Sequence, residues 1–224
     1  MPRIEAKSLL ISGSERLGLP LSPLQVDQFL TYLSELIRWN RKINLTGLRH
    51  EDDIVIKLFL DALTPLVIRE IHGDLKWRDL KWIDVGTGAG SPGLALKIVR
   101  PELQMTLVEP AEKKVAFLHH IIGTLGLSRV SVAQGRVESL KGPKWEGTFD
   151  LLLTRGLDPR FVMKKGTPLV RDGGRILFYQ ANAVRGAWEN RLEEYPELVL
   201  DAIRPVSLPF IADPRHLILL KVFR

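Results

Sequence analysis

The stretch Trp82-Ile-Asp-Val-Gly-Thr-Gly-Ala-Gly-Ser-Pro-Gly93 decides the fold of this chain of 224 residues. An apolar strand that ends at Val85 runs directly into a turn with four glycines, Gly86, Gly88, Gly90 and Gly93. Glycine permits positive φ angles and lets the backbone approach a ligand closely. Pro92 occupies the expected first position of a following helix, whose free amide groups attract negatively charged groups. The stretch predicts a strand, a ligand-binding turn and a helix.

Two acidic residues flank this turn. Asp84 stands two residues before Gly86, and Glu109 ends the next apolar strand, which starts at Met105. A carboxylate at the end of that second strand can accept hydrogen bonds from both hydroxyls of a ribose. The glycine turn and the two acids together predict a pocket for a cofactor that contains adenosine.

Three interpretations of the turn compete. Residues 88–93 also fit the dinucleotide fingerprint G-x-G-x-x-G, but Asp84 would repel the pyrophosphate that such sites hold at the helix start. The same carboxylate suits the amino group and the sulfonium of S-adenosylmethionine, and D-x-G-x-G-x-G followed by a strand-end acid is typical of class I methyltransferases. A tight turn without any ligand is the third interpretation. A P-loop is excluded because no Gly-Lys-Ser/Thr follows.

Hydrophobic spacing divides the chain near residue 79. Residues 1–78 predict helices, one beginning at Pro23 behind the N-cap Ser22 and one near Glu51. Beyond that point apolar strands, at 82–85, 105–109, 130–134, 149–154 and 174–180, alternate with helices near 92–100, 111–125 and 159–170. The alternation predicts a parallel sheet with helices on both faces. The apolar runs 198–203 and 216–223 predict a closing antiparallel pair.

The predicted fold class is therefore α/β, a Rossmann-like class I methyltransferase with a mostly parallel seven-stranded sheet and an N-terminal helical extension. The helical region covers 1–78 and the methyltransferase domain 79–224. Ligands of such sheets bind at the carboxyl ends of the strands, which places Gly86–Gly90, Glu109, Gln134–Glu138 and Arg155 around one crevice. There, Val137 and Glu138 can contact the adenine edge. Arg155 can bind a methionine carboxylate or an RNA phosphate. A solvated loop and a surface arginine are the alternatives.

Composition narrows the possible partners. The chain has 32 Lys and Arg against 26 Asp and Glu, a net charge of +6 that is compatible with nucleic-acid binding. The absence of cysteine excludes disulfides and thiolate metal sites, and the adjacent His119 and His120 would point in different directions on a helix. We therefore expect no metal. Because no apolar run approaches about 18 residues and no secretory core follows Met1, we expect a cytoplasmic protein without a membrane partner.

Several segments resemble those of a known family. They are Trp39-Asn-Arg-Lys-Ile-Asn-Leu-Thr46, Ile83-Asp-Val-Gly-Thr-Gly-Ala-Gly90 with Pro92-Gly93, Arg100-Pro101, Phe117-Leu118, Phe149-Asp150, Arg155, Gly173-Gly-Arg175 and Arg215-His-Leu217. In this order the chain resembles the RsmG (GidB) family of bacterial small-subunit rRNA methyltransferases. The glycine motif occurs in many methyltransferases, whereas the tryptophan element and the Arg-His-Leu element are far more specific.

The resemblance implies an activity and a set of contacts. The family transfers a methyl group from S-adenosylmethionine to N7 of one guanine in 16S rRNA of the small ribosomal subunit. Its cofactor contacts fall on Gly86, Ser91, Val137-Glu138 and Arg155, and its ribose acid falls on Glu109, beside the motif residues Asp84 and Gly88. The chain departs from the family at Leu58 and Gln180, where polar or cationic groups toward the RNA side are typical.

Candidates for contact with RNA are Trp39, Arg41, Arg136, Arg215 and His216. Trp39 can stack on a base or close the helical region as a core-edge residue. Asn44 can orient the target base or cap a turn, and with Arg155 it is the candidate catalytic residue. The cations can equally form a solvated face. No long exposed apolar stripe stands out, so we expect a monomer.

The chemistry of N7 limits what catalysis requires. N7 of guanine carries a lone pair and no proton, so methylation there needs positioning and no general base. The amine methyltransferase signature Asn/Asp-Pro-Pro-Tyr is absent after the fourth strand, where Thr154-Arg-Gly-Leu157 stands. Two alternatives stay open: a methyltransferase of the same fold that acts on a small molecule or protein, and a non-catalytic ribosome-binding protein.

Overall fold

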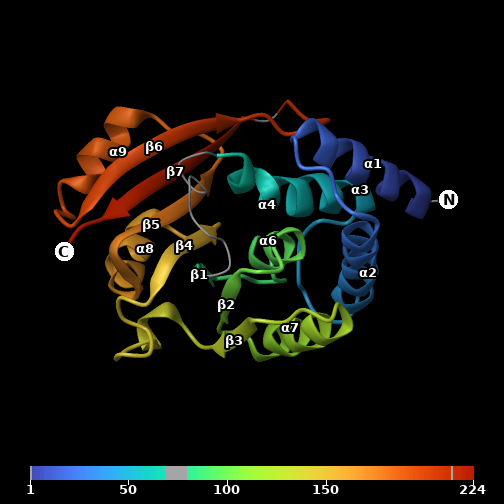
Figure 1. The fold of residues 1–224 in the computed structure, drawn as a ribbon, viewed down its shortest axis with the longest axis horizontal. Helices are drawn as coiled ribbons and strands as arrows, with labels where there is room; N and C mark the ends of the chain where they lie inside the picture. The colour runs from blue at the N-terminus through green and yellow to red at the C-terminus, as the bar shows by residue number, and fades with distance from the viewer. Residues whose placement is uncertain (1, 69–79, 213) are drawn as a thin grey trace.

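The computed structural model describes residues 2–68, 80–212 and 214–224, and its centre is one seven-stranded sheet of order β3-β2-β1-β4-β5-β7-β6 (Figure 1). The strands are β1 Lys81–Val85, β2 Gln104–Glu109, β3 Val130–Gln134, β4 Phe149–Arg155, β5 Val170–Gln180, β6 Leu198–Val206 and β7 Arg215–Val222. Strands β1 to β5 pair in parallel, and β7 runs antiparallel between β5 and β6. The predicted parallel sheet and its closing antiparallel pair are confirmed.

Helices cover both faces of this sheet, as the alternating pattern predicts. One face carries α6 Gly93–Val99 and α7 Glu112–Thr124, and the other carries α8 Pro159–Gly166 and α9 Arg185–Leu192 (Figure 1). The sequence did not predict α9, because Trp188 is its single buried residue and its apolar pattern is correspondingly weak. The expected place of Pro92 is wrong by one position: Pro92 is the N-cap, and α6 begins at Gly93.

The N-terminal region is helical, as predicted. It comprises α1 Pro2–Arg16, α2 Pro23–Asn40, α3 Glu51–Ile54, the π-helix η1 Val55–Leu60, α4 Asp61–Leu63 and the 3-10 helix η2 Thr64–Val67. The predicted N-cap of α2 is confirmed, since Ser22 and Gln25 form a reciprocal capping box. The spacing predicted helix beyond Glu51 but not the widened turn of η1.

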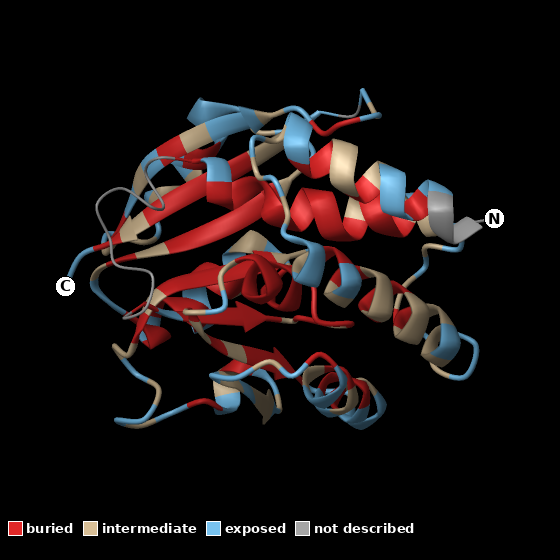
Figure 2. Cartoon of the chain, turned by 45° about the vertical axis from the view of Figure 1, so that its right-hand side comes forward, coloured by how far each residue is buried: buried red, intermediate tan, exposed pale blue. Residues whose placement is uncertain are grey.

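These helices share a core with the sheet. Helix α2 buries Phe29, Tyr32 and Leu36 in a cluster that also contains Trp82 of β1 and Leu107 of β2. Figure 2 shows buried positions concentrated along the strands and on the helix sides that face them. The predicted division at 78/79 lies within residues 69–79, outside the described residues. Among the described residues, no helix is both long and apolar enough to span a membrane.

Candidate active site

The glycine turn after β1 has the backbone conformation that its sequence predicts. Gly86 has a φ of 73° and Gly90 a φ of 96°, values that residues with a Cβ rarely adopt. A Cβ at Gly86 would also lie 2.9 Å from Cδ1 of Leu157, and one at Gly90 would lie 2.4 Å from Cδ1 of Leu94. The amide of Gly86 donates to the carbonyl of Val108 in β2 over 3.0 Å. The turn is therefore tightly packed and tied to the second strand.

Asp84 lies beneath this turn and is fully buried. Its Oδ2 accepts hydrogen bonds from Oγ1 of Thr87 at 2.6 Å and from the amide of Gly93 at 2.8 Å. Its Oδ1 is buried without a hydrogen-bond partner. Burial raises the pKa of Asp84 to about 6, although Thr87 and Gly93 favour the charged form. The carboxylate joins the turn to the start of α6 and keeps one oxygen available.

Glu109, at the end of β2, closes onto the same turn. Its Oε2 accepts from the amide of Gly88 at 3.0 Å, and its Oε1 accepts from the amide of Ala111 at 3.0 Å. The side chain is buried. Each oxygen has a second lone pair for a further donor. The two acids singled out in the sequence thus both hold the glycine turn.

A cavity of about 170 Å³ opens beside the turn at the carboxyl ends of the strands. Most of its wall is apolar, and it is lined by Val85, Gly86, Val108, Pro110, Gly135, Arg136, Val137, Glu138, Leu157 and Phe161. Thus Gly86 and the Val137-Glu138 pair, far apart in sequence, share one cavity. Oε2 of Glu138 is buried without a partner, so it can accept from a ligand. A larger cavity of about 510 Å³ includes Lys81, Gln104 and Thr148, at the amino ends of strands, and lies away from the turn.

Leu157 and Phe161 are wall residues that the sequence analysis missed. Both follow β4 within a few residues, Leu157 in the loop and Phe161 in the first turn of α8. The amide of Phe161 donates to Oδ1 of Asp158, the N-cap of α8, over 3.0 Å. The sequence could have indicated Leu157 as a wall residue, because it is an apolar residue directly after Arg155-Gly156.

Arg155, at the end of β4, is held by polar groups from two other segments. Its Nη2 donates to Oγ of Ser91 over 3.1 Å, and its Nη1 donates to the carbonyl of Lys57 over 2.9 Å. Oγ of Ser91 in turn donates to the carbonyl of Leu58 over 2.8 Å. The predicted cofactor residues Ser91 and Arg155 therefore touch each other, next to the π-helix η1.

Asp61 completes this cluster and was not singled out in the sequence. It is buried, and its Oδ2 lies 3.4 Å from Nη1 of Arg155 and 3.8 Å from Nε of Arg215. Burial raises the pKa of Asp61, while Arg155 and Arg215 both act to lower it. The signal for it was a lone carboxylate inside the apolar run of residues 54–63.

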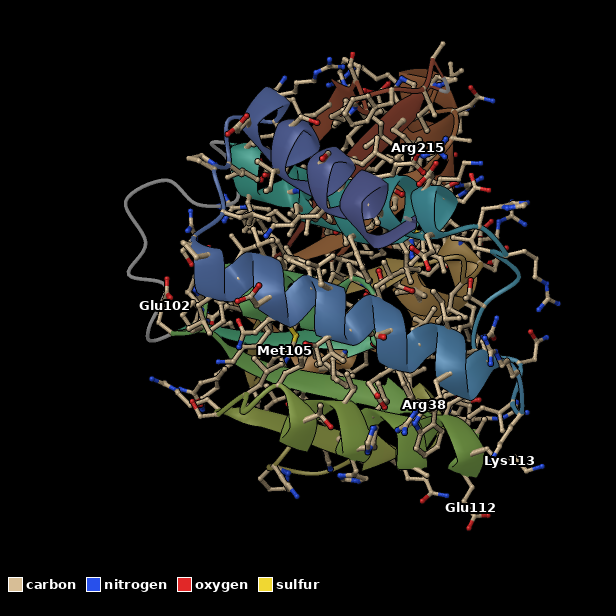
Figure 3. All side chains as sticks on the ribbon, turned by 90° about the vertical axis from the view of Figure 1, so that its right-hand side faces the viewer. Arg38, Glu102, Met105, Glu112, Lys113 and Arg215 are labelled. Atoms are coloured by element: carbon tan, nitrogen blue, oxygen red, sulfur yellow. The ribbon has the colours of Figure 1, made fainter. Side chains whose placement is uncertain are left out.

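The predicted RNA residues occupy several places at the carboxyl ends of the strands. The ring of Trp39 packs 5.6 Å from that of Phe117 and 5.1 Å from that of His120, as a core-edge residue would. Arg41 and Asn44 are exposed in the loop after α2. In Figure 3, Arg38 and Lys113 lie at this end of the molecule, and Glu102, which precedes β2, lies at the opposite end.

The loop that carries Asn44 is held by Asn40, which the sequence analysis did not single out. Oδ1 of Asn40 accepts from the amides of Leu45 and Thr46 at 2.8 and 3.1 Å. Nδ2 of the same side chain donates to the carbonyl of Thr46 over 3.0 Å. Asn40 thus fixes the loop and leaves Asn44 facing solvent.

The remaining candidates lie around the same edge. Arg136 is exposed at the cavity beside the turn. His216 pairs with Gln180 across β5 and β7, and its Nδ1 lies 3.2 Å from the carbonyl of Ala181. The side chain of Leu58, where the chain departs from the family's pattern, is buried in the core. The described residues contain no group of three or more His, Cys, Asp or Glu arranged for a metal ion.

The site suits S-adenosylmethionine. Two buried carboxylate oxygens, on Asp84 and Glu138, have no partner and can accept from amino groups. The cavity beside Gly86 has mostly apolar walls, and Leu157 packs so close to Gly86 that no Cβ would fit there. The guanidinium of Arg155 contacts Ser91 of the turn, and the carboxylate of Glu109 contacts Gly88. This donor and acceptor set matches an adenosine that carries both an ammonium and a carboxylate.

Solved structures share the fold. TrmN from Thermus thermophilus superposes with a TM-score of 0.55 over 75% of this chain and 53% of that chain, at 16% identity. TYW2 from P. horikoshii, determined in complex with MeSAdo, superposes with a TM-score of 0.53 over 67% of this chain and 59% of that chain, at 17% identity. At these identities the likeness shows the fold alone, that of class I methyltransferases.

Sequence relatives are far closer. The relative from Caldanaerobacter subterraneus subsp. tengcongensis, named ribosomal RNA small subunit methyltransferase G, is 36% identical over 95% of this chain and 88% of its own length. Its namesake from Dictyoglomus thermophilum is 38% identical over 82% of this chain and 75% of its own length. The family described as GidB, rRNA small subunit methyltransferase G, matches residues 25–218. The chain therefore belongs to the GidB family and is an S-adenosylmethionine-dependent rRNA methyltransferase.

Proposed function

We propose that this chain methylates N7 of a guanine in 16S rRNA of the small ribosomal subunit, with S-adenosylmethionine as methyl donor. The observation that carries the proposal is the packed glycine turn between Asp84 and Glu109, in a chain that the GidB family matches over residues 25–218. In keeping with the family, we expect it to act in the cytoplasm. Because no long exposed apolar stripe stands out in the sequence, we expect a monomer.

The cofactor would lie across the carboxyl ends of β1, β2 and β4. The cavity between Val137 and Leu157 has the apolar walls that an adenine requires, and the free Oε2 of Glu138 can accept from its amino group. Glu109 would accept from the ribose hydroxyls, because each of its oxygens binds one amide and has a second lone pair. Asp84 supplies negative charge beside the turn for the ammonium, and Arg155 supplies positive charge for the carboxylate.

Bound S-adenosylmethionine supplies a methyl group activated by a positively charged sulfur. N7 of guanine has a free lone pair and no proton, so the chain needs to hold the base in line with that methyl and needs no general base. Asn44 is exposed on the loop that Asn40 fixes, where its amide can bond a guanine edge. Arg41, Arg136, Arg215 and His216 would contact the RNA around it, and Trp39 supports the same end of α2.

The test is methyl transfer from labelled S-adenosylmethionine to small subunits that lack base methylation, with calorimetry of cofactor binding in parallel. Label in 16S rRNA would support the proposal. Cofactor binding without label in RNA, and with label in a protein or small molecule, would favour a divergent substrate. No cofactor binding would favour a non-catalytic ribosome-binding protein.

A further inference from the structure

Asp61 connects two parts of the site that the sequence keeps far apart. Its Oδ2 lies 3.4 Å from Nη1 of Arg155, the last residue of β4, and 3.8 Å from Nε of Arg215, the first residue of β7. Arg155 stands on the cofactor side, bonded to Ser91 of the glycine turn. Arg215 stands on the side proposed for RNA. One carboxylate oxygen thus faces a cofactor residue and an RNA residue together.

The helix that presents Asp61 has an unusual geometry at this point. Residues Val55–Leu60 form a π-helix, and the amide of Asp61 donates to the carbonyl of Ile56, five residues earlier. Single π-turns inside helices often occur at functional sites. Here the carbonyls of Lys57 and Leu58 accept from Arg155 and Ser91. The π-helix therefore accepts hydrogen bonds from Arg155, which Asp61 also contacts, and from Ser91, which belongs to the glycine turn.

The charges explain why a carboxylate is needed there. The side chains of Arg155 and Arg215 are only 20% and 21% exposed, so their mutual repulsion is weakly screened. A buried carboxylate between two guanidiniums offsets that repulsion and fixes the direction of both. It neutralises one of the two charges, and the second remains for an anionic ligand.

We propose that Asp61 is a positioning residue that sets both guanidiniums and thereby links cofactor binding to RNA binding. This inference rests on the proposed function, because it takes Arg155 as a cofactor contact and Arg215 as an RNA contact. The link is reciprocal, as any thermodynamic coupling between two sites must be. A change at Arg155 therefore alters the affinity for RNA through Asp61.

The experiment measures two affinities in the full chain, for S-adenosylmethionine by calorimetry and for 16S rRNA by filter binding. Asp61→Asn keeps the shape and removes the charge, so both dissociation constants should rise by about tenfold, the difference between a charge-assisted and a neutral hydrogen bond. In the Arg155→Lys background, Asp61→Asn should no longer change cofactor affinity. In the Arg215→Lys background it should no longer change RNA affinity.

Thr64→Val is the matched control for a merely structural effect. Oγ1 of Thr64 donates to the carbonyl of Asp61 over 2.7 Å and is buried, but it carries no charge and touches neither arginine. This variant should lower Tm and leave both affinities unchanged. If Asp61→Asn behaves like Thr64→Val, or if its effects persist at full size in the arginine backgrounds, the proposal is overturned.

A second comparison applies if Asp61→Asn does not fold. The effects of Arg155→Lys and Arg215→Lys on RNA affinity are measured singly and together, and coupling through Asp61 predicts that they are not additive. Additive effects would overturn the proposal. Both assays measure binding and not methyl transfer. If the variants show this coupling but the wild-type chain forms no N7-methylguanine, the proposed function is refuted and the coupling stands.

Discussion

At the scale of single residues, the glycine turn depends on a positive φ angle and on two carboxylates. Gly86 has a φ of 73°. Oδ2 of Asp84 accepts from the amide of Gly93, and Oε2 of Glu109 accepts from the amide of Gly88. These contacts make the turn sensitive to substitution.

Gly86→Val tests the packing of the turn. The substitution puts a side chain into a conformation with φ of 73° and against Leu157, and the left-handed conformation alone costs about 1–2 kcal/mol. We expect a lower Tm and at least about tenfold weaker cofactor binding by calorimetry. Gly123→Ala is the control, since Gly123 is helical with free space around it, and Tm there should stay or rise slightly. Unchanged cofactor affinity in Gly86→Val would contradict the assigned pocket.

Asp84 predicts a pH dependence with a definite sign. Burial raises its pKa from 3.8 to about 6, so the folded chain binds more protons than the unfolded chain between these values. The stability contribution of this group is therefore fully present below about pH 4 and is lost as the pH rises through about 6. Affinity for the cationic cofactor should instead rise over the same window, as the carboxylate ionises.

Calorimetry from pH 5 to pH 8 checks this, with Asp84→Asn as the matched variant. The affinity of the wild-type chain for the cofactor should rise as the pH increases, with a midpoint near pH 6. The variant should bind weakly, with an affinity that does not change with pH. A pH profile that is the same for both chains would remove Asp84 from the cofactor contacts.

The glycine turn was the most predictable part of the site. Its glycines, Asp84 and Glu109 are adjacent or strand-end residues, so sequence alone placed them together. Asp61 could not be found in the same way, because its partner Arg155 lies 94 residues away and only the tertiary fold brings the two together. Asn40 was missed although the residues that it binds are only five and six positions away, because no sequence pattern marks a side chain that bonds the amides of a loop.

At the scale of elements, strands were predicted better than helices. β4 and β5 contain continuous apolar runs, at residues 151–153 and 176–179, which are typical of strands buried on both faces. The predicted ranges of β1 to β4 match the structure to within one residue, whereas β5 begins at Val170, four residues earlier than predicted. The π-helix η1 was missed because hydrophobic spacing reports which face is buried and not which backbone carbonyl each amide reaches. Helix α9 was missed because its residues are mostly exposed.

The loop after α2 gives a prediction at this scale. Asn40→Ala removes three hydrogen bonds to the loop, so we expect a loss of about 1–3 kcal/mol in the free energy of unfolding and slower methyl transfer. Asn44→Ala removes an exposed side chain and should slow transfer while Tm stays unchanged. Denaturant unfolding and initial rates distinguish the two. A stable, fully active Asn44→Ala chain would exclude Asn44 from catalysis.

At the scale of the whole molecule, the helical region and the sheet form one hydrophobic cluster, which the sequence could not show. The amphipathic pattern of α2 indicated which face is buried, but not that Tyr32 donates to the carbonyl of Ala89 in the glycine turn over 2.6 Å. The N-terminal helices therefore support the glycine turn directly.

The net charge of +6 gives a prediction for the complete chain. RNA affinity should fall steeply as salt rises, and Arg41→Gln and Arg136→Gln should each reduce the slope of log K against log salt by about 1. Filter binding over a salt series measures the slope. Lys7→Gln, on the exposed side of α1, is the control and should leave the slope unchanged. A slope that neither arginine alters would place the RNA elsewhere on the surface.

The most direct test of the N7 assignment is strand cleavage specific for N7-methylguanine, on 16S rRNA from small subunits that this chain has methylated with S-adenosylmethionine. The subunits come from a source without base methylation, and a reaction without cofactor is the background. We expect one new cleavage, at a single guanine. Methyl label in the RNA without any new cleavage would show a different target atom and contradict methylation at N7.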